Sequence, residues 1–156
     1  MFNSVAVANK FIQLAGYENR LLTQMQLHKL VFFAHALALA SQDTPLIRGA
    51  FIATQYGPVE AELWEFTKSY GPDLINNYIH TASSDMRLEI LVLKDATAMQ
   101  FCKTTWKNYG KYSSVELSRI THKPGSPWQQ TYRGEWTVIP NALILEYYQT
   151  LLSEAS

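Results

Sequence analysis

The chain has 156 residues, of which 47% are hydrophobic and 17% are charged, and its formal net charge at pH 7 is zero. This length suits one domain with a core of its own, and the composition is too apolar for a disordered segment. A neutral chain lacks the long-range attraction that most binders of nucleic acids or anionic membranes use. We therefore expect residues 1–156 to form a single domain, with nucleic acid and membrane both disfavoured as partners.

Cysteine content and the N-terminal residues bear on the cellular compartment. Cys102 is the only cysteine, so no intrachain disulfide can form. The start of the chain lacks the charged and then apolar segments of a signal peptide. The longest apolar run, Leu30–Ala40, is interrupted by His35 and is shorter than the roughly 20 residues that cross a bilayer. These features predict a cytoplasmic protein without a transmembrane segment.

Two helices are expected in the first forty residues. Apolar residues recur at helical spacing over Ser4–Ala15, and Gly16 follows where a left-handed residue often ends a helix. Thr23 and Gln26 have the spacing of a capping box, which marks the start of a second helix. Because this helix is apolar nearly all round as far as Ala40, we expect it to lie at the buried centre of the fold.

A small β element is expected in the middle of the chain. The segment Ala50–Gln55 has the composition of a strand, and Gly57 and Pro58 are expected to stop it. Proline suits the first position of a helix, so we expect Pro58 to begin a helix that runs to about Ser69. The segment Arg87–Leu93 is compatible with a second strand.

Capping residues predict two more helices in the second half of the chain. Asp95 is placed to cap a helix over residues 95–109. Ser113 and Glu116 form a second capping box, which predicts a helix over residues 113–121.

The C-terminal part is expected to contain a loop and a last helix. Residues 124–127 read Pro-Gly-Ser-Pro and should be a loop, and Pro140 should open an amphipathic helix to about Leu152. Together the elements predict a mainly α (α+β) class, with a compact helical fold, a central buried helix and a small β element.

The histidines and the cysteine give little sign of metal or nucleophile chemistry. His28 and His35 lie two turns apart on the second helix, and neither has a histidine or cysteine three or four residues away. We expect both to be hydrogen-bonded histidines in or near the core. Cys102 lies in an aromatic, apolar helix without a nucleophile signature, so an inert buried thiol is expected. We therefore predict no metal, no cofactor and no enzymatic activity.

An enzyme nevertheless remains an alternative. It would use His122 as a general base with an acid such as Glu60 brought near by folding, and it requires one deep pocket that holds both side chains. The competing expectation for Glu60 is a solvated position in the favourable first turn of a helix.

A local excess of positive charge lies between Lys103 and Arg133, where six basic residues face a single acidic residue, Glu116. Aromatic residues are interleaved with these charges, a mixture that suits an acidic protein surface or a nucleic acid. Since the whole chain is neutral, we favour a protein, and a nucleic-acid-binding regulator is the alternative. The predicted partner-binding residues are Lys103, Trp106, Lys107, Lys111, Arg119, His122, Trp128 and Tyr132.

Four segments, in this order along the chain, resemble the Panacea domain, the SocA-like antitoxin family often described as phage-associated proteins. The segments are residues 8–12 (Ala-Asn-Lys-Phe-Ile), residues 22–34 (from Leu-Thr-Gln to Phe-Phe-Ala), residues 55–59 (Gln-Tyr-Gly-Pro-Val), and Thr121-His122 together with Pro127-Trp128. The motif residues that carry the resemblance are Thr23, His28, Lys29, Tyr56, Gly57, Pro58, Thr121 and Pro127.

The resemblance implies a mostly helical fold with a small sheet, and no catalytic residues. It also implies an antitoxin that neutralises a toxin, usually encoded by an adjacent gene, by direct binding or by delivery to a Clp-type protease. A purely structural role for the motif residues stays open. In that case Gly57 and Pro58 shape a junction from strand to helix, and His122 and Trp128 pin the proline-containing loop to the core.

Overall fold

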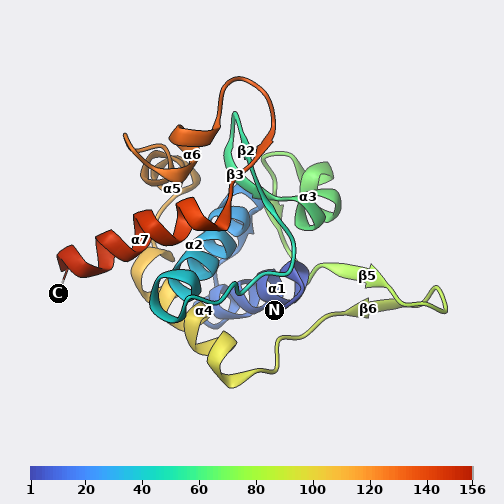
Figure 1. Ribbon diagram of the computed structural model, residues 1–156. Coiled ribbons are helices and arrows are strands. Elements are labelled where there is room, and N and C mark those ends of the chain that lie inside the picture. Colours follow the sequence, from blue (N-terminus) through green and yellow to red (C-terminus); the bar gives the residue numbers. More distant parts are fainter. Residues whose placement is uncertain (156) are drawn as a thin grey trace.

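The computed structural model describes residues 1–155 and shows a mainly helical α+β fold, as expected (Figure 1). Helix α2 runs through the middle of the molecule, and α1, α4 and α7 pack around it. The helices are α1 (Ser4–Tyr17), α2 (Gln24–Gln42), α3 (Ala61–Thr67), the 3-10 helix η1 (Lys68–Tyr70), α4 (Ala96–Tyr109), α5 (Ser114–Thr121), α6 (Pro127–Thr131) and α7 (Asn141–Ala155).

Within residues 1–155 the strands form three small antiparallel sheets. The largest has the order β3-β2-β7, with Ala53 of β2 opposite both Pro58 of β3 and Thr137 of β7. The strands are β1 (Leu22–Thr23), β2 (Phe51–Thr54), β3 (Gly57–Glu60), β4 (Leu74–Ile75), β5 (His80–Ala82), β6 (Leu88–Ile90) and β7 (Thr137–Val138). Strand β1 pairs with β4, and β5 pairs with β6.

The expected capping boxes are present and explain where the helices begin. The Thr23 side chain accepts from the backbone N–H of Gln26, and the Gln26 side chain accepts in return from the Thr23 N–H. Ser113 and Glu116 do the same at the start of α5. Helix α2 is buried along almost its whole length, which confirms its central position.

Helix α1 does not end at Gly16 as expected. It continues to Tyr17, and Asn19 is the residue with a left-handed backbone, at φ 56°. The N–H groups of Glu18 and Arg20 both bond to the carbonyl of Ala15, so the last turn is satisfied without a left-handed glycine.

The expectation that Pro58 begins a helix is wrong. Residues 57–60 instead form β3, which returns along β2 after a turn at Gln55 and Tyr56, and α3 starts only at Ala61. Strand β3 lies at the edge of the sheet and has β2 as its neighbour. The N–H that Pro58 lacks is therefore not needed to bond to a strand on the other side.

The expected loop at residues 124–127 is also shorter than predicted. Pro127 is the first residue of α6, and the Ser126 side chain accepts from the Gln129 N–H at 3.2 Å to cap it. The sequence features, a serine followed by a proline, are those of a helix start, but α6 is only five residues long.

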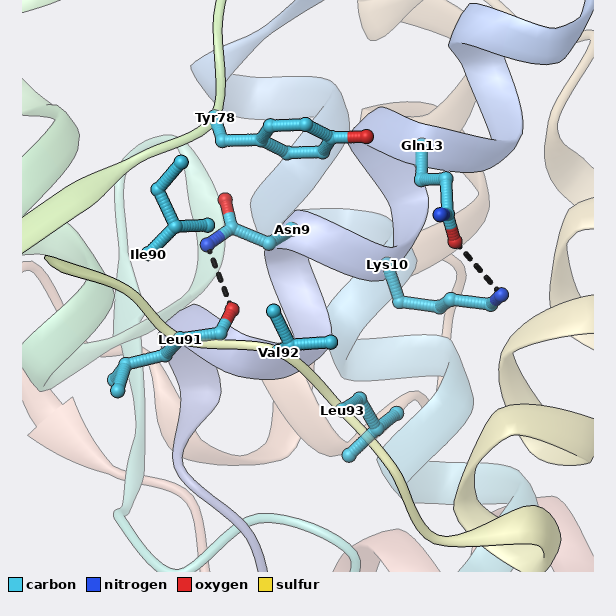
Figure 2. A pocket seen from close by; sticks show the side chains of 8 residues that line it. All are labelled: Asn9, Lys10, Gln13, Tyr78, Ile90, Leu91, Val92 and Leu93. Carbon is cyan, nitrogen blue, oxygen red and sulfur yellow. Dashed lines mark hydrogen bonds between the residues drawn. The ribbon is translucent and has the colours of Figure 1, made fainter.

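A hairpin of β5 and β6 extends away from the helices (Figure 1). The expected strand over Arg87–Leu93 is confirmed only for Leu88–Ile90, which pairs with β5. The base of the hairpin lies against α1 beside a pocket of about 320 Å³, shown in Figure 2.

Asn9 of α1 holds that base in place. Its amide nitrogen donates to the carbonyls of Ile79 (3.1 Å) and Leu91 (3.0 Å), and its oxygen accepts from the Ile79 N–H at 2.8 Å (Figure 2 shows the bond to Leu91). Asn9 is buried, and its two bonds to Ile79 are shielded from water.

Replacing Asn9 by alanine is expected to free the hairpin base. The loss leaves the buried carbonyl and N–H of Ile79 and the part-buried carbonyl of Leu91 unpaired, which should cost about 2–4 kcal/mol of stability. Limited trypsin digestion would detect the freed hairpin, because the exposed Arg87 near the hairpin tip should be cut at least several-fold faster in Asn9→Ala than in the wild type. Gln13, which is half-buried on the same helix and accepts from Lys10 at 2.9 Å, is replaced by alanine as the control. Equal cleavage of all three proteins would refute the role of Asn9.

Candidate functional site

The Tyr-Gly-Pro-Val segment forms the tight turn between β2 and β3. The Thr54 hydroxyl accepts from the Tyr56 N–H and donates to the Gly57 carbonyl, both at 3.0 Å, so it stabilises the turn from inside. Gly57 has φ 95°, a conformation that side chains rarely adopt. The motif is therefore a turn between two strands, and the expected junction from strand to helix is wrong for Gly57 and Pro58.

Three side chains lie close against Gly57. A Cβ atom there would lie 2.8 Å from Lys29 Cε, 3.1 Å from His122 Nε2 and 3.2 Å from Thr121 Oγ1. Glycine is thus required both by the backbone and by the space that α2 and the end of α5 occupy. The contact of Gly57 with Lys29, Thr121 and His122, which we call the junction, brings together three of the four segments singled out in the sequence.

Lys29 is the most unusual residue of the junction. Its side chain is 0% exposed, and burial lowers the pKa of its ammonium from 10.5 to about 7. The partner of Nζ is Met25 Sδ at 3.7 Å, a weak acceptor. Among residues 1–155, no carboxylate forms an ion pair with it.

His122, Trp128 and Tyr132 form an aromatic stack beside the turn. The ring centroids of His122 and Trp128 are 3.9 Å apart, and those of Trp128 and Tyr132 are 5.1 Å apart. Trp128 Nε1 donates to the Thr54 carbonyl at 2.6 Å, which ties α6 to the turn. Burial, and then the charge of Lys29, lower the pKa of His122, whose buried Nε2 has no hydrogen-bond partner within residues 1–155.

A pocket of about 280 Å³ opens in front of this junction. The side chain of Met25 forms part of its wall and also covers the Lys29 ammonium. At the rim, Tyr56 is 46% exposed and Val115 is 67% exposed. The residues that line it are Met25, Gln55, Tyr56, Ser114, Val115, Ser118 and His122.

Replacing Trp128 by phenylalanine should weaken the junction while keeping an aromatic ring on His122. The Thr54 carbonyl loses its donor, so the free energy of unfolding should fall by about 1–2 kcal/mol in urea denaturation. Trp136→Phe is the matched control, since Trp136 Nε1 donates to Gln55 Oε1 at a site where the ring is 45% exposed. If both variants lose the same stability, the Trp128 bond has no special role.

The remaining predicted partner-binding residues lie on other parts of the surface. Lys103 and Lys107 are exposed on α4, whereas Lys111 follows the end of that helix, and Arg119 is exposed on α5. Trp106 is engaged within the molecule, because its Nε1 donates to Glu18 at 2.5 Å and Arg20 stacks over its ring at 5.0 Å.

His28 and His35 are core histidines, as predicted, and each joins two distant segments. His28 Nδ1 accepts from the Glu60 N–H at 3.1 Å, so Nε2 carries the proton and donates to the Thr67 hydroxyl at 3.1 Å. His35 in the same way accepts from the Ile47 N–H and donates to Asn141. Burial lowers the pKa of both rings, which keeps them neutral.

The geometry does not assemble the alternative enzyme site. Glu60 is 1% exposed, and its carboxylate accepts from the Leu63 N–H at 2.7 Å to cap α3, so its expected solvated position is wrong. It lines a different pocket from the one that contains His122. Cys102 is buried, and burial raises the pKa of its thiol to about 12, which makes it a poor nucleophile.

Residues 1–155 contain no cluster of three or more histidine, cysteine, aspartate or glutamate side chains that could hold a metal ion. Within the same residues, no helix combines the length and apolar character needed to span a membrane.

Some residues of the site gave no signal in the sequence. Thr54, Ser114, Ser118 and Met25 are ordinary residues whose roles arise only from contacts between elements. Thr23 shows the same point, because its hydroxyl lies 2.7 Å from the Ser114 hydroxyl and joins the first turns of α2 and α5 in addition to its capping role.

The fold and the junction define a mainly helical protein with a buried lysine beneath a Tyr-Gly-Pro turn. A family model described as antitoxin SocA-like, Panacea domain, matches residues 27–129, a stretch that includes most of α2, the turn, α5 and the start of α6. The chain belongs to this family.

One curated relative is Antitoxin SocA from Caulobacter vibrioides (strain NA1000 / CB15N). It is 28% identical over 134 residues, which cover 85% of this chain and 71% of the relative. No solved structure matches the chain significantly.

Proposed function

We propose that the protein is a cytoplasmic antitoxin that neutralises a protein toxin by binding it directly. The observation that carries this proposal is the family match over residues 27–129, together with the similarity to Antitoxin SocA. Non-catalytic neutralisation agrees with the separation of Glu60 from His122 and with the poor reactivity of Cys102.

The partner surface proposed here is centred on the junction. The Tyr-Gly-Pro turn is tied to α6 by Trp128 and rests on Lys29, so the exposed Tyr56 is presented from a preorganised support. Preorganised aromatic residues dominate the energetics of many protein interfaces. Arg119 and the α4 residues Lys103 and Lys107, with Lys111 beyond them, would add positive charge that attracts an acidic toxin surface.

Co-expression tests the proposal. The gene adjacent to the one encoding this chain is expressed alone and together with this protein, and we expect growth arrest in the first case and recovery in the second. The two proteins should also co-purify as a complex. Failure of the pair to associate, or failure to relieve toxicity, would count against the antitoxin role.

The same cells separate sequestration from delivery to a Clp-type protease. In a host that lacks the protease, sequestration predicts undiminished rescue and an unchanged toxin level. Delivery predicts that rescue is lost and that the toxin accumulates.

A further inference from the structure

Lys29 presents a buried positive charge that the described residues leave uncompensated. Its ammonium is fully buried and contacts the thioether of Met25, and burial is the cause of its lowered pKa, with no carboxylate acting in the opposite direction. Buried charges in proteins are ordinarily paired with an opposite charge and hydrogen-bonded. The lysine therefore lacks the anionic partner that its position calls for.

A second unpartnered group lies at the same place. His122 Nε2 is buried without a hydrogen-bond partner among residues 1–155. Lys29 Cε and His122 Nε2 both approach Gly57 closely, so the two side chains are neighbours. Burial, and then the charge of the neighbouring Lys29, lower the pKa of His122.

The pocket in front of these groups is suited to a single acidic side chain. It has a volume of about 280 Å³ and is lined by no acidic residue and no arginine. Met25 forms part of its wall and lies on the ammonium, and methionine is flexible enough to move aside. The exposed Tyr56 and Val115 at the rim provide apolar surface for the residues next to the acid.

We propose that this pocket binds an acidic side chain of the protein partner, whose carboxylate reaches the Lys29 ammonium and His122 Nε2 once Met25 moves. The proposal rests on the proposed toxin-binding function for the identity of the partner. The chemistry of the pocket itself, a preformed site for a carboxylate, can be tested without any toxin.

A carboxylate built into the pocket provides the first test. Ser118 lines the pocket, and its backbone carbonyl, which accepts from the Thr121 hydroxyl and the His122 N–H, is unaffected by substitution. Ser118→Glu supplies a carboxylate, and Ser118→Gln is the neutral control of the same size. At pH 6.5, below its pKa of about 7, Lys29 is mostly protonated, and we expect Ser118→Glu to melt about 2–4 °C above Ser118→Gln.

The pH dependence of this difference in melting temperature shows whether Lys29 is the group that interacts with the new carboxylate. At pH 9.5 Lys29 is neutral, so the advantage of Ser118→Glu should vanish or reverse. The other titratable groups at the junction are His28, which bonds to the Glu60 N–H, His122 and the pocket residue Tyr56. An advantage that persists at pH 9.5, or no advantage at pH 6.5, would overturn the proposal.

Acetate is the probe for the second test. Titration of the labelled wild-type protein at pH 6.5 and constant ionic strength should give saturable NMR shifts at the amides of Gln55, Tyr56 and Gly57, and Ser118→Glu should abolish them. Inorganic phosphate is titrated in parallel. No saturable acetate shift, or phosphate binding at least tenfold tighter than acetate, would overturn assignment of the pocket to a carboxylate.

A measurement of toxin binding separates this inference from the proposed function. If the wild type neutralises a toxin, Ser118→Glu should bind that toxin at least tenfold more weakly than Ser118→Gln, because its own carboxylate occupies the pocket. Equal binding by the two variants would overturn the role of the pocket in toxin recognition. If the wild type binds no toxin, the proposed function fails, while the acetate and melting results still decide whether the pocket is a carboxylate site.

Discussion

Replacing Lys29 by methionine is expected to raise the free energy of unfolding by about 4 kcal/mol at pH 7. The ammonium of Lys29 is fully buried, and its pKa falls from 10.5 to about 7 in the folded protein. Methionine has a similar length and no charge, so it removes the cost of burying the cation while filling most of the same space.

The effect should depend on pH in a defined direction. The unfolded chain keeps the Lys29 proton up to about pH 10.5, whereas the folded chain releases it near pH 7. The unfolded state therefore binds more protons between these values, and wild-type stability rises with pH through this window. From pH 7 to pH 9 the wild type should gain about 2 kcal/mol relative to Lys29→Met.

Urea denaturation of both proteins at pH 7, 8 and 9 measures this difference. Lys103→Met is the control, because Lys103 is exposed on α4 and its removal should leave the pH dependence of the wild type unchanged. Parallel pH profiles for the wild type and Lys29→Met would contradict the buried, easily deprotonated lysine described here.

Replacing Gly57 by alanine is expected to destabilise the protein by about 3–5 kcal/mol. Two costs combine at this position. The backbone at φ 95° strains any residue with a Cβ, and the new methyl group would overlap with Lys29 Cε at 2.8 Å and crowd His122 Nε2 at 3.1 Å. The turn, the buried lysine and the aromatic stack should all be displaced.

Gly125→Ala separates the two costs. Gly125 has a similar positive φ of 80°, but a Cβ there would meet no atom within 4 Å. The free energy of unfolding of Gly125→Ala, measured by urea denaturation, should therefore fall by only about 1–2 kcal/mol, from backbone strain alone. Equal losses for the two variants would show that the contacts of Lys29 and His122 with Gly57 contribute nothing.

The sequence by itself determined those features that depend on neighbouring residues. The capping boxes of Thr23 with Gln26 and of Ser113 with Glu116 fixed two helix starts, because a cap needs only side chains three residues apart. The nearly all-apolar α2 predicted its own central position, since such a surface must be covered on every side.

Proline showed the limit of local inference. Pro58 was expected to begin a helix and Pro127 to lie in a loop, yet Pro58 lies in the edge strand β3 and Pro127 begins α6. Strand β3 pairs with β2, which also pairs with β7 from near the end of the chain. That sheet is a tertiary feature, and it decided the conformation of Pro58.

The candidate site was likewise only partly visible in the sequence. The motif residues Lys29 and Gly57 and the predicted partner-binding residue His122 were singled out, but nothing in their spacing shows that they touch. Tertiary structure buried Lys29 and Glu60, which a sequence would place in solvent, and gave Glu60 a helix to cap while leaving Lys29 without an anion. Burial and pairing of charges depend on the surroundings of the whole fold, and for that reason the structure alone revealed the pocket.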